Sequence, residues 1–131
     1  MVKTLITDKG KEEVLRLAFK GASGFNYIAL GGANSSGAQA NGQFVEITDS
    51  SYRRQKTEIN DTTVDDKNIV VSATFNETNL NSSQGELIKE IGIVNSSEPT
   101  SAETFFAYCE VPNIVKDDSI SLKYSVIIEI E

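Results

Sequence analysis

Residues 119–130 read Ser-Ile-Ser-Leu-Lys-Tyr-Ser-Val-Ile-Ile-Glu-Ile, and this stretch decides the fold. Apolar residues occupy every second position from Ile120 to Ile130, and the residues between them are mostly polar. Successive side chains of a β-strand point to opposite faces, so this period of two predicts a long strand with one face in the core and the other largely in water. Such a strand also has a long edge that must be paired or covered.

Upstream of this strand, shorter segments rich in β-branched and aromatic residues predict further strands. They cover residues 25–30, a brief ordered stretch at 44–47, and then 52–59, 69–75, 87–94 and 104–111. We expect 52–59 and 69–75 to pair as a hairpin, and 104–111 to end at Pro112. Residues 33–42 are almost all small or polar, and we expect them to form a mobile loop because they can bury little apolar surface.

The N-terminal segment has helical periodicity instead. Thr7 can cap the helix by accepting an orphan N–H group of the first turn. Apolar residues between positions 14 and 19 give one face, and Glu12 and Arg16 are spaced to form an i,i+4 ion pair. Gly21 follows a lysine and is a typical stop signal. We therefore expect a helix at about 7–20.

Together these patterns predict one mainly-β domain over residues 1–131, with strands from about residue 25 to the end. The expected architecture is an antiparallel β-sandwich with the single N-terminal helix packed against it. The length of 131 residues suits one domain.

Composition excludes several classes of function. Twelve basic and nineteen acidic residues give a net charge of −7, which argues against binding to nucleic acid through its phosphates. Histidine is absent, which removes the commonest general base and most zinc sites. The single cysteine allows no internal disulfide. The sequence also contains no apolar run of the ~20 residues that a membrane-spanning helix needs, so we expect no membrane partner.

The motifs that could carry chemistry are weak. Gly32 and Gly37 have half the spacing of a phosphate-binding loop, but the lysine that meets the phosphates is missing. The doublets Asp65–Asp66 and Asp117–Asp118 fall where turns are expected, and aspartate favours turns. Cys109 lies in an apolar strand without an adjacent base. We therefore expect no enzyme, no cofactor and no metal site.

Arg53 and Arg54 are the most informative charged residues. Two neighbouring residues of a strand point to opposite faces, so one of these arginines faces inward and needs a carboxylate partner. Glu90 has the most apolar surroundings of the carboxylates, between Ile88 and Ile91. We predict an ion pair between Glu90 and one of the two arginines; the alternative is that all three are solvated.

Several segments resemble the phage tail-collar fibre family, the N-terminal attachment domain of bacteriophage tail fibres. Lys89, Glu90, Ile91, Gly92 and Ile93 resemble the Arg-Glu-Ile-Gly-Leu pattern of that family. Four other segments match in the same order: Leu5–Gly10, Tyr27–Gly31, Tyr52–Arg54, and Phe105–Pro112, which resembles Leu-Phe-Ala-x-x-x-Leu-Pro. The resemblance extends over nearly the whole chain.

The resemblance implies a structural virion protein, located in the phage tail and made in the host bacterial cytoplasm. Such a protein is a tail, collar or baseplate adaptor that attaches a tail fibre. Its expected partners are other phage tail, fibre or baseplate proteins, and a homo-oligomer, with a trimer favoured. Family members usually continue into a shaft and a receptor-binding tip, so a chain of this length favours an adaptor or a truncated fibre. We further expect residues 33–42 to order on assembly.

The alternative is a β-sandwich module that binds a host surface carbohydrate. It predicts a concave patch of exposed aromatic side chains, and Tyr52 and Tyr108 are the candidates for it.

Overall fold

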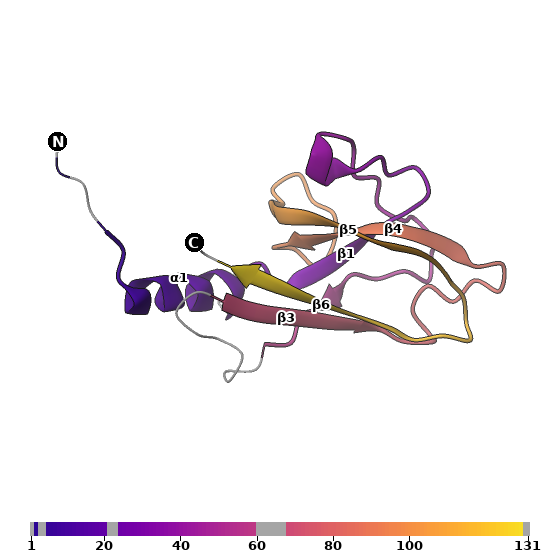
Figure 1. The fold of residues 1–131 in the computed structure, drawn as a ribbon. Coiled ribbons are helices and arrows are strands. Elements are labelled where there is room, and N and C mark those ends of the chain that lie inside the picture. The colour runs from indigo at the N-terminus through magenta and orange to yellow at the C-terminus, as the bar shows by residue number, and fades with distance from the viewer. Residues whose placement is uncertain (1, 3–4, 21–23, 60–67, 130–131) are drawn as a thin grey trace.

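A computed structural model describes residues 2, 5–20, 24–59 and 68–129. The chain forms one helix and then a series of strands, with a short 3₁₀ turn in the loop after the first strand (Figure 1). In chain order they are α1 (Asp8–Lys20), β1 (Tyr27–Gly31), η1 (Ala38–Ala40), β2 (Gln55–Lys56), β3 (Asn68–Phe75), β4 (Glu86–Val94), β5 (Phe105–Lys116) and β6 (Leu122–Glu129).

The strands form two antiparallel sheets that face one another. The larger sheet has the order β2-β1-β4-β5, and the smaller one consists of β3 and β6. Between them lies a core in which Leu30 and Ile91 from the larger sheet pack with Ala73 and Phe75 from the smaller one. The alternation predicted for the last strand is confirmed, because β6 has Ile128 buried and Ile127 exposed. The predicted mainly-β, sandwich-like fold with one N-terminal helix is therefore confirmed.

The helix packs at one end of the sandwich (Figure 1). Leu15 and Phe19 are buried against Ile69 and Val71 of β3, because they lie on one face of α1. The predicted N-cap is present: Thr7 Oγ1 accepts the Gly10 N–H at 3.0 Å. The predicted Glu12–Arg16 pair is also present, at 3.1 Å. Within the described ranges, no helix combines the length and apolar character needed to cross a membrane.

The predicted hairpin between residues 52–59 and 69–75 is wrong. β3 pairs along its whole length with β6, and only one bridge, Glu58 with Ser72, joins it to the earlier segment. The earlier segment contributes only the two-residue strand β2, which pairs with β1. The reason is burial: β6 offers β3 a strand of equal length with a matching apolar face, whereas residues 52–59 are largely polar. The doublet Asp65–Asp66 lies outside the described residues.

Pro112 does not end a strand, contrary to the prediction. β5 continues through it to Lys116, and β5 has two more residues than β4 between the pairs Ile88–Ile114 and Glu90–Glu110. This irregularity is a bulge on the outer strand of the sheet. Proline is tolerated at such a position because its missing N–H removes no ladder hydrogen bond.

The composition of residues 33–42 predicts a mobile loop. In the structure this loop is bonded to its own return segment and to the larger sheet. Ser35 Oγ accepts the Val45 N–H at 2.8 Å and donates to the Val45 carbonyl at 3.1 Å. Gln39 Oε1 accepts the Glu110 N–H of β5 at 3.3 Å. These bonds anchor a loop that has little apolar surface of its own; its mobility and its ordering on assembly stay predictions.

Candidate functional site

The arginine segment before β2 places its side chains on alternate sides. Tyr52 and Arg54 are buried, at 8% and 6% exposure, while Arg53 between them is exposed. The prediction that one of the two arginines faces inward is therefore confirmed for Arg54. Arg53 instead lies along its own loop and donates to the carbonyls of Ser50 at 2.8 Å and Tyr52 at 2.7 Å.

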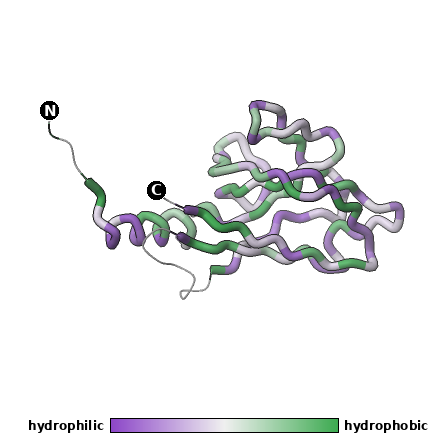
Figure 2. The backbone as a smooth tube through the Cα atoms, in the orientation of Figure 1, coloured by the Kyte–Doolittle hydropathy of each residue, from purple (hydrophilic) through white to green (hydrophobic). Residues whose placement is uncertain are grey.

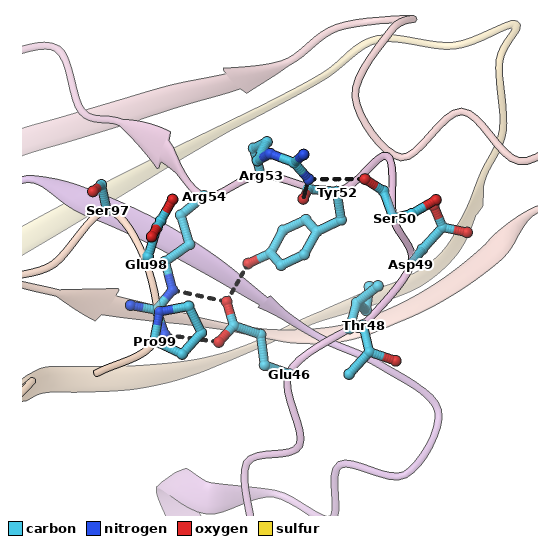
Figure 3. A pocket seen from close by; sticks show the side chains of 11 residues that line it. Glu46, Thr48, Asp49, Ser50, Tyr52, Arg53, Arg54, Ser97, Glu98 and Pro99 are labelled. Atoms are coloured by element: carbon cyan, nitrogen blue, oxygen red, sulfur yellow. Dashed lines mark hydrogen bonds and ion pairs between the residues drawn. The ribbon is translucent and has the colours of Figure 1, made fainter. Parts of the chain in front are cut away.

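Arg54 is the centre of a buried ionic cluster (Figure 3). Its Nε donates to Glu46 Oε2 at 2.8 Å and its Nη2 to Glu46 Oε1 at 2.7 Å, so this pair is bidentate. Its Nη1 donates to Glu103 Oε2 at 2.7 Å and to the Ser96 carbonyl at 3.1 Å. The guanidinium carbon lies 5.5 Å from the centroid of the Phe105 ring. One side chain thus ties the segment around residues 46–54 to the loop between β4 and β5, which is 42 or more residues away in the sequence. Such bidentate geometry is strong and directional.

Tyr52 connects this cluster to the sheet. Its hydroxyl donates to Glu46 Oε2 at 2.5 Å and accepts the backbone N–H of Leu30 in β1 at 2.9 Å. Burial, followed by the negative charge of Glu46, raises the pKa of Tyr52. Burial alone would lower the pKa of Arg54, but the hydrogen bonds and charges of Glu46 and Glu103 outweigh it and raise that pKa. We call Glu46, Tyr52, Arg54 and Glu103 the arginine clamp.

The predicted partner of the arginine is wrong. The ion pairs of Arg54 go to Glu46 and Glu103, and Arg53 donates to backbone carbonyls. Glu90 is buried on β4 at 2% exposure, as its apolar neighbours indicated, but its Oε2 accepts the Ala38 N–H at 3.3 Å. Glu90 therefore anchors the loop after β1 and takes no part in the clamp.

The sequence carried only a weak signal for the true partners. Glu46 lies in the short ordered stretch 44–47, which forms a bridge to Gly31 of β1. Glu103 lies in the loop before β5, and nothing in its local sequence marks it as an ion-pair partner. Both carboxylates reach Arg54 through tertiary folding, which local patterns do not report.

The family-like motif Lys89–Ile93 forms the middle of β4. Ile91 and Ile93 are fully buried in the two parts of the core. A Cβ atom on Gly92 would lie 2.5 Å from Phe105 Cε2, so only glycine fits beneath that ring. Lys89 Nζ donates to the Ser35 carbonyl at 3.0 Å. These residues therefore hold the sheet and its covering loop together.

Neither tyrosine proposed for carbohydrate binding is a free platform. Tyr52 is buried, and its hydroxyl already donates one hydrogen bond and accepts another within the protein. Tyr108 packs with Phe44 and Phe105, each with ring centroids 5.1 Å away. The aromatic surface that the carbohydrate alternative needs is thus used for internal packing at these two positions.

An open cavity of about 670 Å³ lies beside the clamp (Figure 3). Its walls are the clamp residues Glu46, Tyr52 and Arg54, together with the loops at 47–50 and 97–99. The charges of Glu46 and Arg54 are paired with each other, while Asp49, Arg53 and Glu98 also line the cavity and bring further charge to it. The arrangement is suited to holding loops in place.

Other candidates for chemistry are equally modest. Burial raises the pKa of the Cys109 thiol, which disfavours the reactive thiolate. Across the described ranges there is no cluster of three or more cysteine, aspartate or glutamate side chains placed to hold a metal ion. The chain matches no family model, no curated protein and no solved structure.

Proposed function

We propose that this protein is a structural component of a tailed bacteriophage, an adaptor of the tail, collar or baseplate that attaches a tail fibre. The observation that carries the proposal is spatial. The segments that resemble the tail-collar fibre family are scattered along the sequence, yet most of them are neighbours in the larger sheet or in the clamp beside it.

The register of the larger sheet supports this. β1, β4 and β5 contain three of the family-like segments and are consecutive strands of that sheet. The segment Tyr52–Arg54 contributes two members of the arginine clamp. Residues paired across the three strands are Leu30 with Ile91, Gly31 with Glu90, Gly92 with Tyr108, and Glu90 with Glu110. The resemblance thus rests on residues that stabilise one unit, as expected for an attachment domain that must transmit force without deforming.

The clamp suits a protein that must keep its shape under mechanical force. Arg54 joins the loop after β1, the segment before β2 and the loop between β4 and β5 through charge-assisted hydrogen bonds. Such bonds resist displacement of one loop relative to another, because each broken pair would leave a desolvated charge. The proposed partners are other tail, fibre or baseplate proteins, with a homo-oligomer, in particular a trimer, as the proposed state in the virion.

Deletion of the gene from the phage that encodes this chain tests the role. If the chain attaches fibres, the mutant particles keep their tails but lack fibres in electron micrographs, and they adsorb poorly to cells. A plasmid copy should restore fibres. Mutant particles with a normal set of fibres and normal adsorption would overturn the proposal.

A further inference from the structure

We propose that the open side of the sandwich, between β5 and β6, receives residues 2–7 of a second copy of this chain as an added β-strand. The inference rests on the proposed structural role and names the self-assembly surface for it. It begins from an asymmetry in the fold, in which a sheet of four strands faces a sheet of only two.

Among the residues that the structure describes, the two sheets are bonded to each other on one side of the sandwich but not on the other. On the β2–β3 side, the Glu58–Ser72 bridge and the Thr57 N–H bonded to the Asn26 carbonyl join the two sheets. On the other side, β5 and β6 are the outer strands. Gln39 of the loop after β1 meets β5 at Glu110, whereas in the described part of the chain no strand pairs with the second edge of β6. An unpaired edge is a template for a further strand.

The core is also incompletely covered on this side. Apolar side chains from both outer strands pack against the core while remaining only half-buried: Cys109, Val111 and Ile114 from β5, and Leu122, Tyr124 and Val126 from β6. A strand added along β6 would pair with its backbone and extend the smaller sheet beneath the larger one. It would therefore remove more of these apolar groups from water.

The chain itself supplies a suitable strand. Residues 2–7 read Val-Lys-Thr-Leu-Ile-Thr, a composition rich in β-branched residues. Val2, Leu5 and Ile6 are 90%, 93% and 62% exposed. The part of this segment next to α1 is hydrophobic and leads away from the sandwich (Figures 1 and 2). Six extended residues span ~20 Å, which suits the eight-residue strand β6.

Charge favours a second copy as the source of the segment. Residues 1–11 contain three lysines and one aspartate, whereas the rest of the chain contains nine basic and eighteen acidic residues. The open side carries the acidic residues Asp117 and Asp118 in the turn between β5 and β6 and Glu129 at the end of β6, beside the single exposed lysine Lys123 of β6. The excess of lysine in the added strand and the first turn of the helix that follows it is therefore complementary to the acidic residues around the open side of another copy.

Size-exclusion chromatography with light scattering tests the exchange on the full chain. We expect the wild type to give a multiple of the 14.3 kDa monomer mass and Leu5→Asp/Ile6→Asp to give the monomer, because two charges would enter the added strand. Circular dichroism checks that this variant is folded. Leu17→Asp is the matched control, since Leu17 is 66% exposed on α1 outside the segment, and it should keep the wild-type mass.

A photo-cross-linking residue at position 6 locates the contact. In a mixture of ¹⁵N-labelled and unlabelled chains, we expect position 6 of one copy to attach to residues 105–129 of another. A monomeric wild type, cross-links within one copy, or cross-links to α1 would overturn strand exchange. The outcome is separable from that of the proposed function, because a monomeric chain whose gene deletion removes fibres would keep the structural role and exclude the exchange.

Discussion

Arg54 forms ion pairs with two carboxylates, Glu46 and Glu103, from a buried position. Its side chain is 1% exposed, so replacing it with methionine leaves Glu46 and Glu103 without their counter-ion. We expect Arg54→Met to lower the free energy of unfolding by about 3 kcal/mol or more, as for other broken buried ion pairs. Urea denaturation followed by circular dichroism measures this. The control Arg53→Met removes an exposed side chain, and its effect should stay within about 0.5 kcal/mol; equal effects of the two variants would contradict a buried clamp.

Tyr52 and Tyr124 should respond in opposite ways to loss of the hydroxyl. Tyr52→Phe leaves the Leu30 N–H and Glu46 short of a partner and should cost about 1–3 kcal/mol of stability. The hydroxyl of Tyr124 is buried and has no hydrogen-bond partner within the described ranges. Tyr124→Phe should therefore be neutral or stabilising by up to about 1 kcal/mol. The same denaturation experiment compares the pair, and a destabilised Tyr124→Phe would show that its hydroxyl has a partner.

Lys116 links stability to alkaline pH. It is fully buried, and its Nζ donates to the carbonyls of Leu80 at 3.4 Å and Asp117 at 3.1 Å. Burial lowers its pKa below the ordinary 10.5, and the nearby charges of Glu77, Asp117 and Asp118 offset this only in part. The unfolded chain then binds this proton more tightly than the folded chain does. Stability from this group therefore rises as the pH increases from the folded pKa toward 10.5.

Lys116→Met removes that dependence. We expect the free energy of unfolding of the wild type to rise relative to that of the variant as the pH is raised from neutral to 10.5. The reason is that the buried lysine loses its proton in this range, and with it the cost of burying a positive charge, whereas methionine carries no charge at any pH. Urea denaturation of both proteins at each pH gives the difference. A difference that is constant over this range, or that falls, would contradict a lowered pKa.

Among the elements, the loop after β1 depends on a close approach at Gly31. A Cβ atom there would lie 2.7 Å from Ser35 Oγ, 2.8 Å from Glu90 Cγ and 2.9 Å from Phe44 Cε2, so it is enclosed on three sides. We expect Gly31→Ala to cost about 1–3 kcal/mol through overpacking and to release the loop.

Limited proteolysis measures the release. Cleavage within residues 33–44 should be several times faster in Gly31→Ala than in the wild type, since a displaced loop is more accessible to the protease. Ala40→Ser changes an exposed position in the same loop and should leave the cleavage rate unchanged. Equal rates in all three proteins would mean that the loop tolerates the extra carbon.

Element types could be predicted from the sequence because they depend on local periodicity. The alternation in β6 and the cap and ion pair of α1 lie within one element and were confirmed. Strand pairing could not be predicted in the same way, because β3 could pair with any strand that offers an apolar face. Pro112 was misjudged for a related reason, since only the position of β5 at the sheet edge makes a proline acceptable there.

The arginine clamp likewise combines one feature that local sequence predicts with one that depends on tertiary folding. That one arginine of the pair faces inward follows from strand geometry, and that a carboxylate must meet it follows from the cost of a buried charge. The choice between Glu46, Glu90 and Glu103 depends on how two loops fold over the sheet. The apolar neighbours of Glu90 agree with its burial, but burial alone does not identify a partner.

At the scale of the whole molecule, the arginine clamp and the incompletely covered part of the core lie on different sides of the sandwich. The clamp and the covering loop tie the loops around β1, β4 and the start of β5 to one another. The β5–β6 side keeps open edges and half-buried apolar groups. This division agrees with the proposed adaptor role, because a neighbour can join the open side while the core keeps its packing.

The proposed place of this chain on a phage tail is tested most directly by immunogold electron microscopy of intact, purified particles. An antibody raised against the full chain should label the tail at the point where fibres attach, and particles from the gene-deletion mutant should stay unlabelled. Tailed particles that carry fibres but bind no gold, while the chain is found only in the unassembled fraction of the lysate, would contradict the structural role.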